Sequence, residues 1–212
     1  MGYSGSTPPR SPEPRLPLFL EVTGDDHPKA CTGRRLLHRR LARPVPRSGL
    51  LRPAPVVLDP YAREPLSAED REAARRGGVL AVDCSWNRLA DRGRLPEEPR
   101  NPRAGRHRRL PILVAANPQH FGRVAELNTV EALSAALYLL GCPAQAAELL
   151  EGFRGGPGFL EINQERLAAY SRARDHDAVL ALERDLFGAL PAGSPAPPAG
   201  GRAPPRRGTA PR

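Results

Sequence analysis

The chain has 212 residues, of which 40% are hydrophobic, so it can bury the core of one ordinary domain or of two small ones. Its 26 prolines and 20 glycines are concentrated toward the two ends, and we expect residues 1–17 and 191–212 to be disordered. The net charge of +9 favours a polyanionic partner, and the lack of any long apolar segment argues against a membrane protein.

The first half of the chain alternates short apolar runs with amphipathic segments. The runs predict strands at 18–22, 55–58 and 79–83. Between them, the pattern predicts a basic helix over 32–41 and a second helix that Ser67 caps and that reaches Arg76. Residues 89–107 are expected to form a polar loop, and 112–116 form a further apolar run. This alternation indicates a parallel sheet with crossover connections.

The second half has the periodicity of helices. Asn128 and Glu131 form a capping box in front of a helix whose apolar residues share one face. Three further helices are predicted to begin at Pro143, Asn163 and Asp177. We therefore expect an α/β domain over 18–110, followed by a mainly helical domain over 111–190.

The apolar run 79–83 is the most informative feature, because it ends in a carboxylate and is followed by a thiol, a hydroxyl and the only tryptophan. Ligands of open α/β sheets bind where the strands end and the loops begin. Asp83, Ser85 and Trp86 are therefore candidates for a small-molecule site. The alternative is that Asp83 caps a turn and that Trp86 fills the core.

Two arginine clusters, 31–47 and 100–109, contain no acidic residue. Lys29 is the only lysine among the 32 basic residues, so the use of arginine instead of lysine is not informative by itself. The clustering of the arginines predicts contacts with phosphates. A solvated surface is the alternative. Because aromatic residues make up only 5% of the chain and fall mostly where helices need a core, we expect no platform for stacking on bases.

Five short blocks of sequence stand out in chain order. They are Pro28-Lys-Ala-Cys-Thr-Gly-Arg34, Asp83-Cys-Ser-Trp-Asn87, Arg109-Leu-Pro111, Ala115-Ala-Asn-Pro118 and Glu131-Ala-Leu133. Together they resemble the ribosomal-RNA aminocarboxypropyltransferase family from Leu18 to Phe187. The resemblance implies an α/β fold, with a SPOUT-like parallel sheet that contains a trefoil knot, followed by an all-helical C-terminal domain.

The resemblance also implies an activity in ribosome biogenesis. Enzymes of this family take S-adenosylmethionine and transfer its 3-amino-3-carboxypropyl group to N3 of N1-methylpseudouridine in small-subunit ribosomal RNA. We expect a monomer that acts on the small ribosomal subunit in the cytoplasm, where three cysteines at unrelated spacings stay reduced. Two alternatives stay open. One is an rRNA methyltransferase that binds the same cofactor in a different orientation, and the other is a non-catalytic ribosome-assembly protein that binds RNA.

By position, the resemblance implies a cofactor pocket formed by Thr32, Leu80, Leu110, Ala125 and Thr129. Thr129 falls in the first turn of a predicted helix, where free N–H groups suit a carboxylate. Trp86 is interpreted as the wall that holds the methionine side of the cofactor, through cation–π attraction to the sulfonium. Asp83 is interpreted as the base or orienting group for the acceptor, so its loss should lower turnover more than cofactor affinity.

The arginine clusters acquire a role from the same resemblance. The residues predicted to contact the RNA are Arg34, Arg35, Arg39, Arg40, Arg106, Arg108 and Arg109. No metal is expected, because the histidines and cysteines lack the spacing of metal ligands. The chain departs from the family in several places. Asn117-Pro-Gln-His-Phe-Gly122 stands where Asn-Pro-Val-Asn-Tyr-Gly is usual, Ala125 stands where an aromatic residue is common, residues 153–159 lack a Trp-Gly pair, and the tail 191–212 has no counterpart.

Overall fold

Five short strands form one parallel sheet in the computed structural model, which describes residues 15–24, 31–46, 51–84, 86 and 104–188. The strands are β1 (Leu18–Val22), β2 (Arg43–Pro44), β3 (Val56–Leu58), β4 (Val79–Asp83) and β5 (Arg106–Arg108). Their order is β2-β1-β4-β3-β5, and every neighbouring pair is parallel. The predicted parallel pairing is therefore confirmed, and β4 lies at the centre of the sheet.

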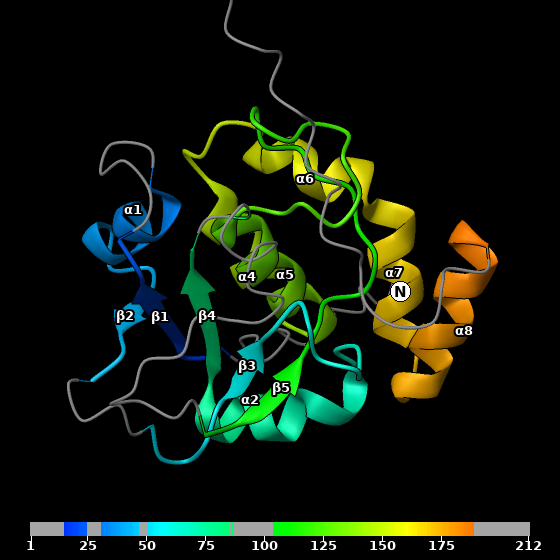
Figure 1. Cartoon of the computed structure of the whole chain (residues 1–212), viewed down its shortest axis with the longest axis horizontal. Coiled ribbons are helices and arrows are strands. Elements are labelled where there is room, and N and C mark those ends of the chain that lie inside the picture. The colour runs from blue at the N-terminus through cyan, green and yellow to red at the C-terminus, as the bar shows by residue number, and fades with distance from the viewer. Residues whose placement is uncertain (1–14, 25–30, 47–50, 85, 87–103, 189–212) are drawn as a thin grey trace, which may run out of the picture.

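Helices follow the strands and cover the sheet. In the described part of the chain they are α1 (Thr32–His38), α2 (Arg71–Gly77), α4 (Thr129–Leu139), α5 (Pro143–Leu150), α6 (Gly156–Ile162), α7 (Gln164–Arg172) and α8 (His176–Phe187), and a 3₁₀ turn, η1 (Ala68–Asp70), leads into α2. Figure 1 shows the arrowhead of β4 pointing between α1 and α4, with α7 and α8 on the side of the molecule far from α1. The architecture is an α/β fold, as predicted.

Local sequence signals set where two of these helical segments begin. The Asn128 side chain accepts a hydrogen bond from the Glu131 N–H at 3.0 Å, and the Glu131 carboxylate accepts one from the Asn128 N–H at 2.9 Å. Ser67 and Asp70 form the same reciprocal pair at η1. Each box satisfies two amides that the first helical turn would otherwise leave without a partner. Both predicted caps are therefore confirmed.

Other elements correct what the sequence pattern predicts. The cap of α8 is Asp175, whose carboxylate accepts a first-turn amide at 2.7 Å, and Asp177 lies inside the helix. Helix α6 occupies a segment rich in glycine and proline, and β5 occupies the basic segment that the pattern assigns to a loop. The apolar run 112–116 is not a strand, and within it Val114 forms an isolated bridge to Val124.

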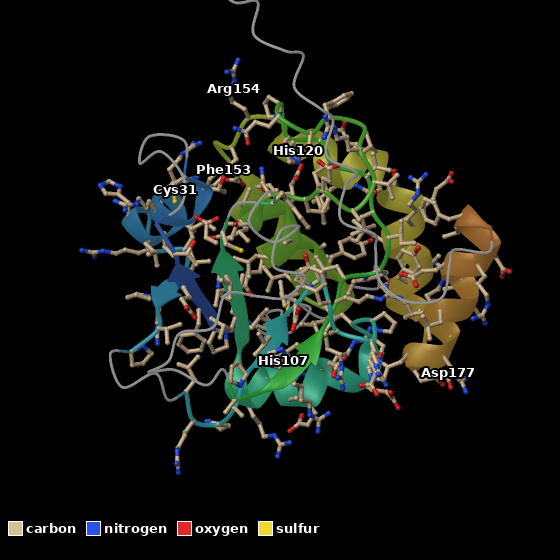
Figure 2. The ribbon with its side chains drawn as sticks, in the orientation of Figure 1. Cys31, His107, His120, Phe153, Arg154 and Asp177 are labelled. Atoms are coloured by element: carbon tan, nitrogen blue, oxygen red, sulfur yellow. The ribbon has the colours of Figure 1, made fainter. Side chains whose placement is uncertain are left out.

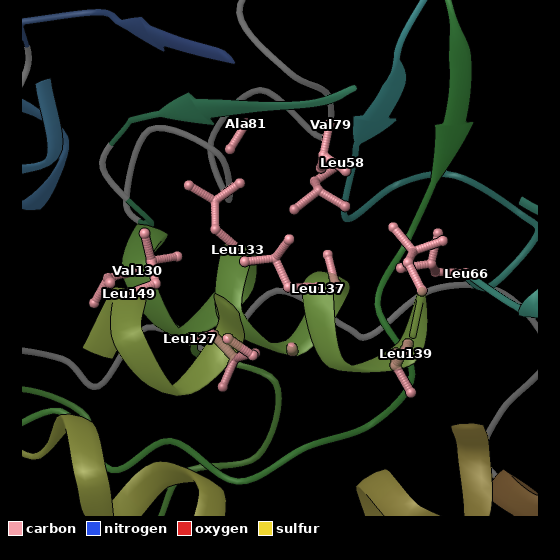
Figure 3. Packing of buried hydrophobic residues seen from close by; sticks show 14 of the residues in the cluster. Leu58, Leu66, Val79, Ala81, Leu127, Val130, Leu133, Leu137, Leu139 and Leu149 are labelled. Carbon is pink, nitrogen blue, oxygen red and sulfur yellow. The ribbon is translucent and has the colours of Figure 1, made fainter. Parts of the chain in front are cut away.

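One face of β4 packs against α4 at the centre of the main core. Val79 and Ala81 point toward Leu133 and Leu137, and all four residues are buried (Figure 3). Each leucine buried in this way stabilises the fold by about 1.5–3 kcal/mol relative to its exposed state. The same core continues into α2, α5 and α7, so that the sheet and the helices share it.

The opposite face of the sheet carries a smaller apolar cluster. Val57 and Leu80 are buried there, and Tyr61 and Trp86 pack against them. Because successive side chains of a strand point to opposite faces, β4 is apolar on both, which explains its uninterrupted apolar run in the sequence. Asp83 falls on the face that α4 covers, with Val79 and Ala81.

The start of the described chain is part of the fold. Leu16 is buried, and its N–H and C=O bind the two ends of the Gln145 amide at 2.9 and 3.0 Å. Arg15 pairs with Glu148 at 2.6 Å. Residues 15–17 thus pack against the molecule, whereas the rest of the predicted N-terminal extension and the tail 191–212 lie outside the described residues. Within the described residues, no helix has the length and apolar character needed to cross a membrane.

Candidate functional site

The strand order locates a site at the ends of β1 and β4. These two strands are neighbours, but the connection after β1 leads through α1 to β2 on one side, and the chain after β4 leads to β5 on the other. Ligands of open α/β sheets bind in the crevice that such a divergence opens. Thr23 ties the ends of the two strands together, because its N–H and its hydroxyl both donate to the Asp83 carbonyl at 3.1 Å.

The Asp83 carboxylate joins two helix beginnings at this point. Its Oδ2 accepts hydrogen bonds from the Cys31 thiol at 2.9 Å and from the Gly33 N–H at 3.1 Å, both at the start of α1. Its Oδ1 accepts a hydrogen bond from the hydroxyl of Thr129, the first residue of α4. Asp83 is only 6% exposed. We call this set of hydrogen bonds the Asp83 clamp.

The chemistry of the clamp depends on a protonated thiol. Burial, and then the hydrogen bond to Asp83, raise the pKa of Cys31 to about 11. The thiol therefore keeps its proton near neutral pH and donates it to the carboxylate. The Cys31 sulfur also accepts the Arg34 N–H at 3.4 Å, so a thiol takes the capping role that a hydroxyl or carboxylate usually has.

Only a glycine fits at position 33 beside the clamp. A Cβ atom there would lie 2.5 Å from Asp83 Oδ2, inside the contact distance of the two atoms. The Cys-Thr-Gly turn and Asp83 are therefore complementary in shape as well as in hydrogen bonding. Both carboxylate oxygens of Asp83 are occupied by protein donors, which is the geometry of a positioning residue. A role for Asp83 as the base stays a prediction.

Trp86 links the end of β4 to the segment that precedes α4. Its indole Nε1 donates to the Leu127 carbonyl at 3.0 Å, and its ring packs beside Leu80 in the smaller apolar cluster. The ring is half-buried, so it fills part of the core and keeps part of its surface exposed near the end of β4. Ser85, the other candidate in this segment, lies outside the described residues.

The other predicted pocket residues approach the same sheet edge. Thr32 is the first residue of α1, directly after Cys31. The strand register places Leu110, two residues beyond β5, at about the level of Asp83. Ala125 lies two residues before Leu127 and has a φ of +63°, a left-handed conformation that its N–H stabilises by donating to Leu113 at 2.8 Å. Neither Leu110 nor Ala125 is one of the donors of the Asp83 clamp, which are Cys31, Gly33 and Thr129.

Two of the arginines predicted to contact RNA have structural roles instead. The Arg108 side chain is 13% exposed and binds Asp70 at 3.0 Å and Glu64 at 2.7 Å. The Arg109 side chain is 11% exposed and binds both oxygens of Glu183 at 2.7 Å. A guanidinium held in this way is not presented to a phosphate, so we remove both residues from the RNA surface. Arg106 is exposed on β5.

The arginines of α1 are exposed and partly anchored. Arg35 and Arg39 lie over the Phe153 ring, with guanidinium carbons 4.5 and 5.4 Å from its centroid. Arg35 also donates to the Gly152 carbonyl at 2.9 Å, and Arg39 donates to the Glu151 carbonyl at 2.5 Å. Arg34 is exposed on α1, and Arg40 is exposed two residues beyond the end of that helix. These four residues can meet a phosphate without breaking a buried ion pair.

Some residues of the site are not singled out by the sequence pattern. Cys31 and Gly33 belong to a recognised block, but their bonds to Asp83 join segments that are 52 and 50 residues apart. The sequence identifies Glu131 only as a capping residue. In the structure its carboxylate also accepts hydrogen bonds from the Ala116 N–H at 2.8 Å and from the Asn117 side-chain amide at 2.7 Å. Among the described residues, no group of three or more potential ligands could hold a metal ion.

A parallel sheet with polar side chains at the divergence of two strands is the arrangement in which α/β proteins bind small molecules. A family model described as "Ribosome biogenesis protein, C-terminal" matches residues 56–187. The 16S rRNA aminocarboxypropyltransferase of Methanopyrus kandleri is 44% identical over 161 residues, which cover 76% of this chain and 92% of that protein. The enzyme of the same name from Halobacterium salinarum is 41% identical over 170 residues, 80% of this chain and 95% of that protein.

A solved structure gives the same result. The SAM-dependent rRNA:acp-transferase Tsr3 from Vulcanisaeta distributa superposes with a TM-score of 0.67 at 30% sequence identity, covering 82% of this chain and 99% of that chain. This chain belongs to the 16S rRNA aminocarboxypropyltransferase family, and it is an enzyme of that family.

Proposed function

We propose that this protein transfers the 3-amino-3-carboxypropyl group of S-adenosylmethionine to N3 of N1-methylpseudouridine in small-subunit ribosomal RNA. The observation that carries the proposal is the Asp83 clamp. It joins three segments of the chain that carry residues assigned to the cofactor by the family resemblance: Thr32 beside Cys31, Trp86 just after Asp83, and Thr129 itself. Their meeting place is the strand divergence where a small molecule is expected.

The residues at this place fit the chemical groups of S-adenosylmethionine. The Asn128 side chain accepts the N–H of Glu131, the third residue of α4. The N–H groups of the first two residues of α4 can then bind the methionine carboxylate. The half-buried indole of Trp86 offers an aromatic face to the sulfonium, an attraction of about 0.5–2 kcal/mol. The clamp holds Thr129 at the start of α4, so the carboxylate-binding end of the pocket is set before the cofactor arrives.

Orientation decides which group leaves the sulfonium. All three carbons on the sulfur are activated, and the one that faces the attacking nitrogen in line is transferred. In the proposed arrangement, α4 and Trp86 fix the methionine side so that its propyl carbon faces the RNA and its methyl group faces the protein. The N3 proton of the acceptor must leave as nitrogen attacks, and Asp83 is the candidate acceptor of that proton through a rearranged clamp.

A label-transfer experiment tests the proposal. Purified protein is incubated with small ribosomal subunits and S-adenosylmethionine labelled either at the carboxyl carbon or at the methyl carbon. We expect the carboxyl label to enter the RNA and the methyl label to stay out. Entry of the methyl label would support the methyltransferase alternative. Entry of neither label, with RNA binding retained, would support the non-catalytic assembly protein.

Trp86→Ala is expected to weaken cofactor binding by about tenfold or more, because the sulfonium loses its aromatic face and the crevice loses a wall. Isothermal titration calorimetry with S-adenosylmethionine measures the change. Trp86→Phe is the matched control, because it keeps an aromatic ring and removes only the hydrogen bond to Leu127. It should retain most of the affinity. Wild-type affinity in Trp86→Ala would exclude the indole from the pocket.

Finer features belong to the same proposal. We infer a SPOUT-like sheet with a trefoil knot, supported by the parallel order β2-β1-β4-β3-β5 and by the return of the chain after β5 to pack α4 on β4. The monomeric state and the cytoplasmic location stay predictions.

A further inference from the structure

The loop 117–124 exposes an aromatic side chain, that of Phe121. Phe121 is 71% exposed, the highest value among the large hydrophobic residues of the described chain, and Val124 beside it is 49% exposed. The other exposed large hydrophobic residues, Ile162 and Leu186, are aliphatic. Two neighbouring exposed apolar side chains, one of them aromatic, make this loop a candidate contact site for a partner.

The loop that carries Phe121 is held in one conformation. The Ala115 N–H donates to the Arg123 carbonyl, and the Gly122 N–H donates to the Ala115 carbonyl, both at 2.8 Å. Inside the loop, the buried Asn117 side chain accepts the His120 N–H at 3.0 Å. Such a loop presents its ring with little entropy left to lose on binding.

The same loop is tied to the proposed cofactor site. The Asn117 amide donates to the Glu131 carboxylate at 2.7 Å, and Glu131 lies in the first turn of α4. Thr129, in that same turn, is part of the Asp83 clamp. The position of Phe121 is therefore coupled to the place where the acceptor nucleoside must meet the cofactor.

A turn with exposed basic charge lies between the loop and α1. Residues 151–156 form this turn, and a Cβ at Gly155 would collide with the Ala116 carbonyl, so the turn touches the base of the loop. Arg154 is exposed on the turn. On its other side, Arg35 and Arg39 bind its carbonyls. Figure 2 shows Cys31, Phe153, Arg154 and His120 along the same upper side of the molecule.

The charges of this surface favour an RNA strand over a protein. The exposed guanidinium groups are those of Arg34, Arg35, Arg39, Arg40 and Arg154, and the exposed acid among them is Glu151. Arg123 is not counted, because it pairs with Glu126 at 3.0 Å. A single strand of RNA offers phosphates for the arginines and a base for the ring, whereas a duplex hides its base faces.

We propose that α1, the turn 151–156 and the loop 117–124 form the surface that binds the rRNA strand, and that Phe121 stacks on an unpaired base beside the target nucleoside. This inference rests on the proposed function, because it takes rRNA as the substrate. On this surface the RNA lies away from β5, because Arg108 and Arg109 at that strand are held in ion pairs. We call this face the Arg–Phe121 surface.

Phe121→Ala tests the stacking contact by fluorescence anisotropy. The probe is a labelled RNA hairpin with the unpaired loop of the decoding region of small-subunit rRNA, and the comparison probe is a fully paired RNA of the same length. We expect Phe121→Ala to bind the hairpin about tenfold more weakly, and the duplex within a factor of about two of wild type. Phe121→Trp should restore hairpin affinity, and Leu186→Ala, an exposed hydrophobic on α8, should change nothing.

Arg154→Gln tests the charged part of the surface in the same assay. Loss of one phosphate contact should reduce the slope of log affinity against log salt by about one unit. Arg75→Gln is the matched control, because Arg75 is exposed on α2, at the opposite end of the molecule in Figure 1. An unchanged slope in Arg154→Gln would remove the turn from the surface.

The outcomes separate this inference from the proposed function. Wild-type hairpin affinity in Phe121→Ala, with carboxyl-label transfer to rRNA intact, would overturn the stacking role and leave the proposed function standing. Failure of the wild-type protein to transfer the carboxyl label to small subunits would overturn the proposed function, and with it the inference that rests on it. Because Phe121 is exposed, its substitution is not expected to unfold the protein, and circular dichroism checks that it does not.

Discussion

Asp83→Ala is expected to lower cofactor affinity and group transfer together, with a fall in activity of about 10²-fold or more. The sequence alone predicts a larger loss of turnover than of affinity, and the Asp83 clamp is the reason for the different expectation. The substitution removes the acceptor of three hydrogen bonds at a buried point, and each stranded donor costs about 1–3 kcal/mol. Without the carboxylate, the beginnings of α1 and α4 are no longer held together. Calorimetric titration with S-adenosylmethionine and the label-transfer assay measure the two losses.

Gly33→Ala is the variant that separates positioning from proton transfer. It keeps the Asp83 carboxylate but places a Cβ 2.5 Å from Oδ2, so the clamp must open. If Asp83 acts by positioning, Gly33→Ala should lose cofactor affinity and activity in the same proportion as Asp83→Ala. If Asp83→Ala lost turnover alone, with unchanged cofactor affinity, the carboxylate would act as the base and the positioning role would be wrong.

Glu183→Ala is expected to have the largest effect on stability. The carboxylate is 3% exposed and accepts two hydrogen bonds from Arg109 and one from the Ile112 N–H. Its removal leaves a buried guanidinium without a counter-charge, which costs about 3–5 kcal/mol. For a folded unit of this size, that corresponds to a fall in Tm of roughly 6–20 °C. Differential scanning calorimetry measures it.

Two controls accompany this substitution. Asp185→Ala removes an exposed carboxylate from the same helix and should leave Tm unchanged. The double variant Arg109→Met with Glu183→Leu removes both charges, and it should recover most of the stability that the single variant loses. A Tm for Glu183→Ala within about two degrees of wild type would mean that the pair is weaker than its geometry indicates.

Most elements of the fold were predictable because their signals are local. The bounds of β1 and β4 follow from short apolar runs, and Asn128 with Glu131 marks the start of α4 within four residues of chain. Hydrogen bonds between near neighbours depend on the backbone conformation of a few residues, so the sequence states them directly. Strand β5 and helix α6 carry no such signal, since one is basic and the other begins with glycine and proline.

The candidate site was predictable in part for a different reason. The end of β4 is a place where α/β sheets bind ligands, so Asp83 and Trp86 could be proposed from position in the chain. The partners of Asp83 could not, because Cys31 and Thr129 lie 52 and 46 residues away and meet it through the packing of α1 and α4 on the sheet.

The sequence determines the net charge of the protein, whereas the tertiary structure determines which side chains are exposed. The sequence predicts a basic protein that binds a polyanion, because net charge is a sum over residues and does not depend on the fold. Which arginines are presented to that partner depends on tertiary contacts: Arg109 is held in an ion pair by Glu183, 74 residues away, while Arg154 remains exposed. Phe121 lies in solvent for the same reason, since only the packed structure decides which apolar side chains find a place in the core.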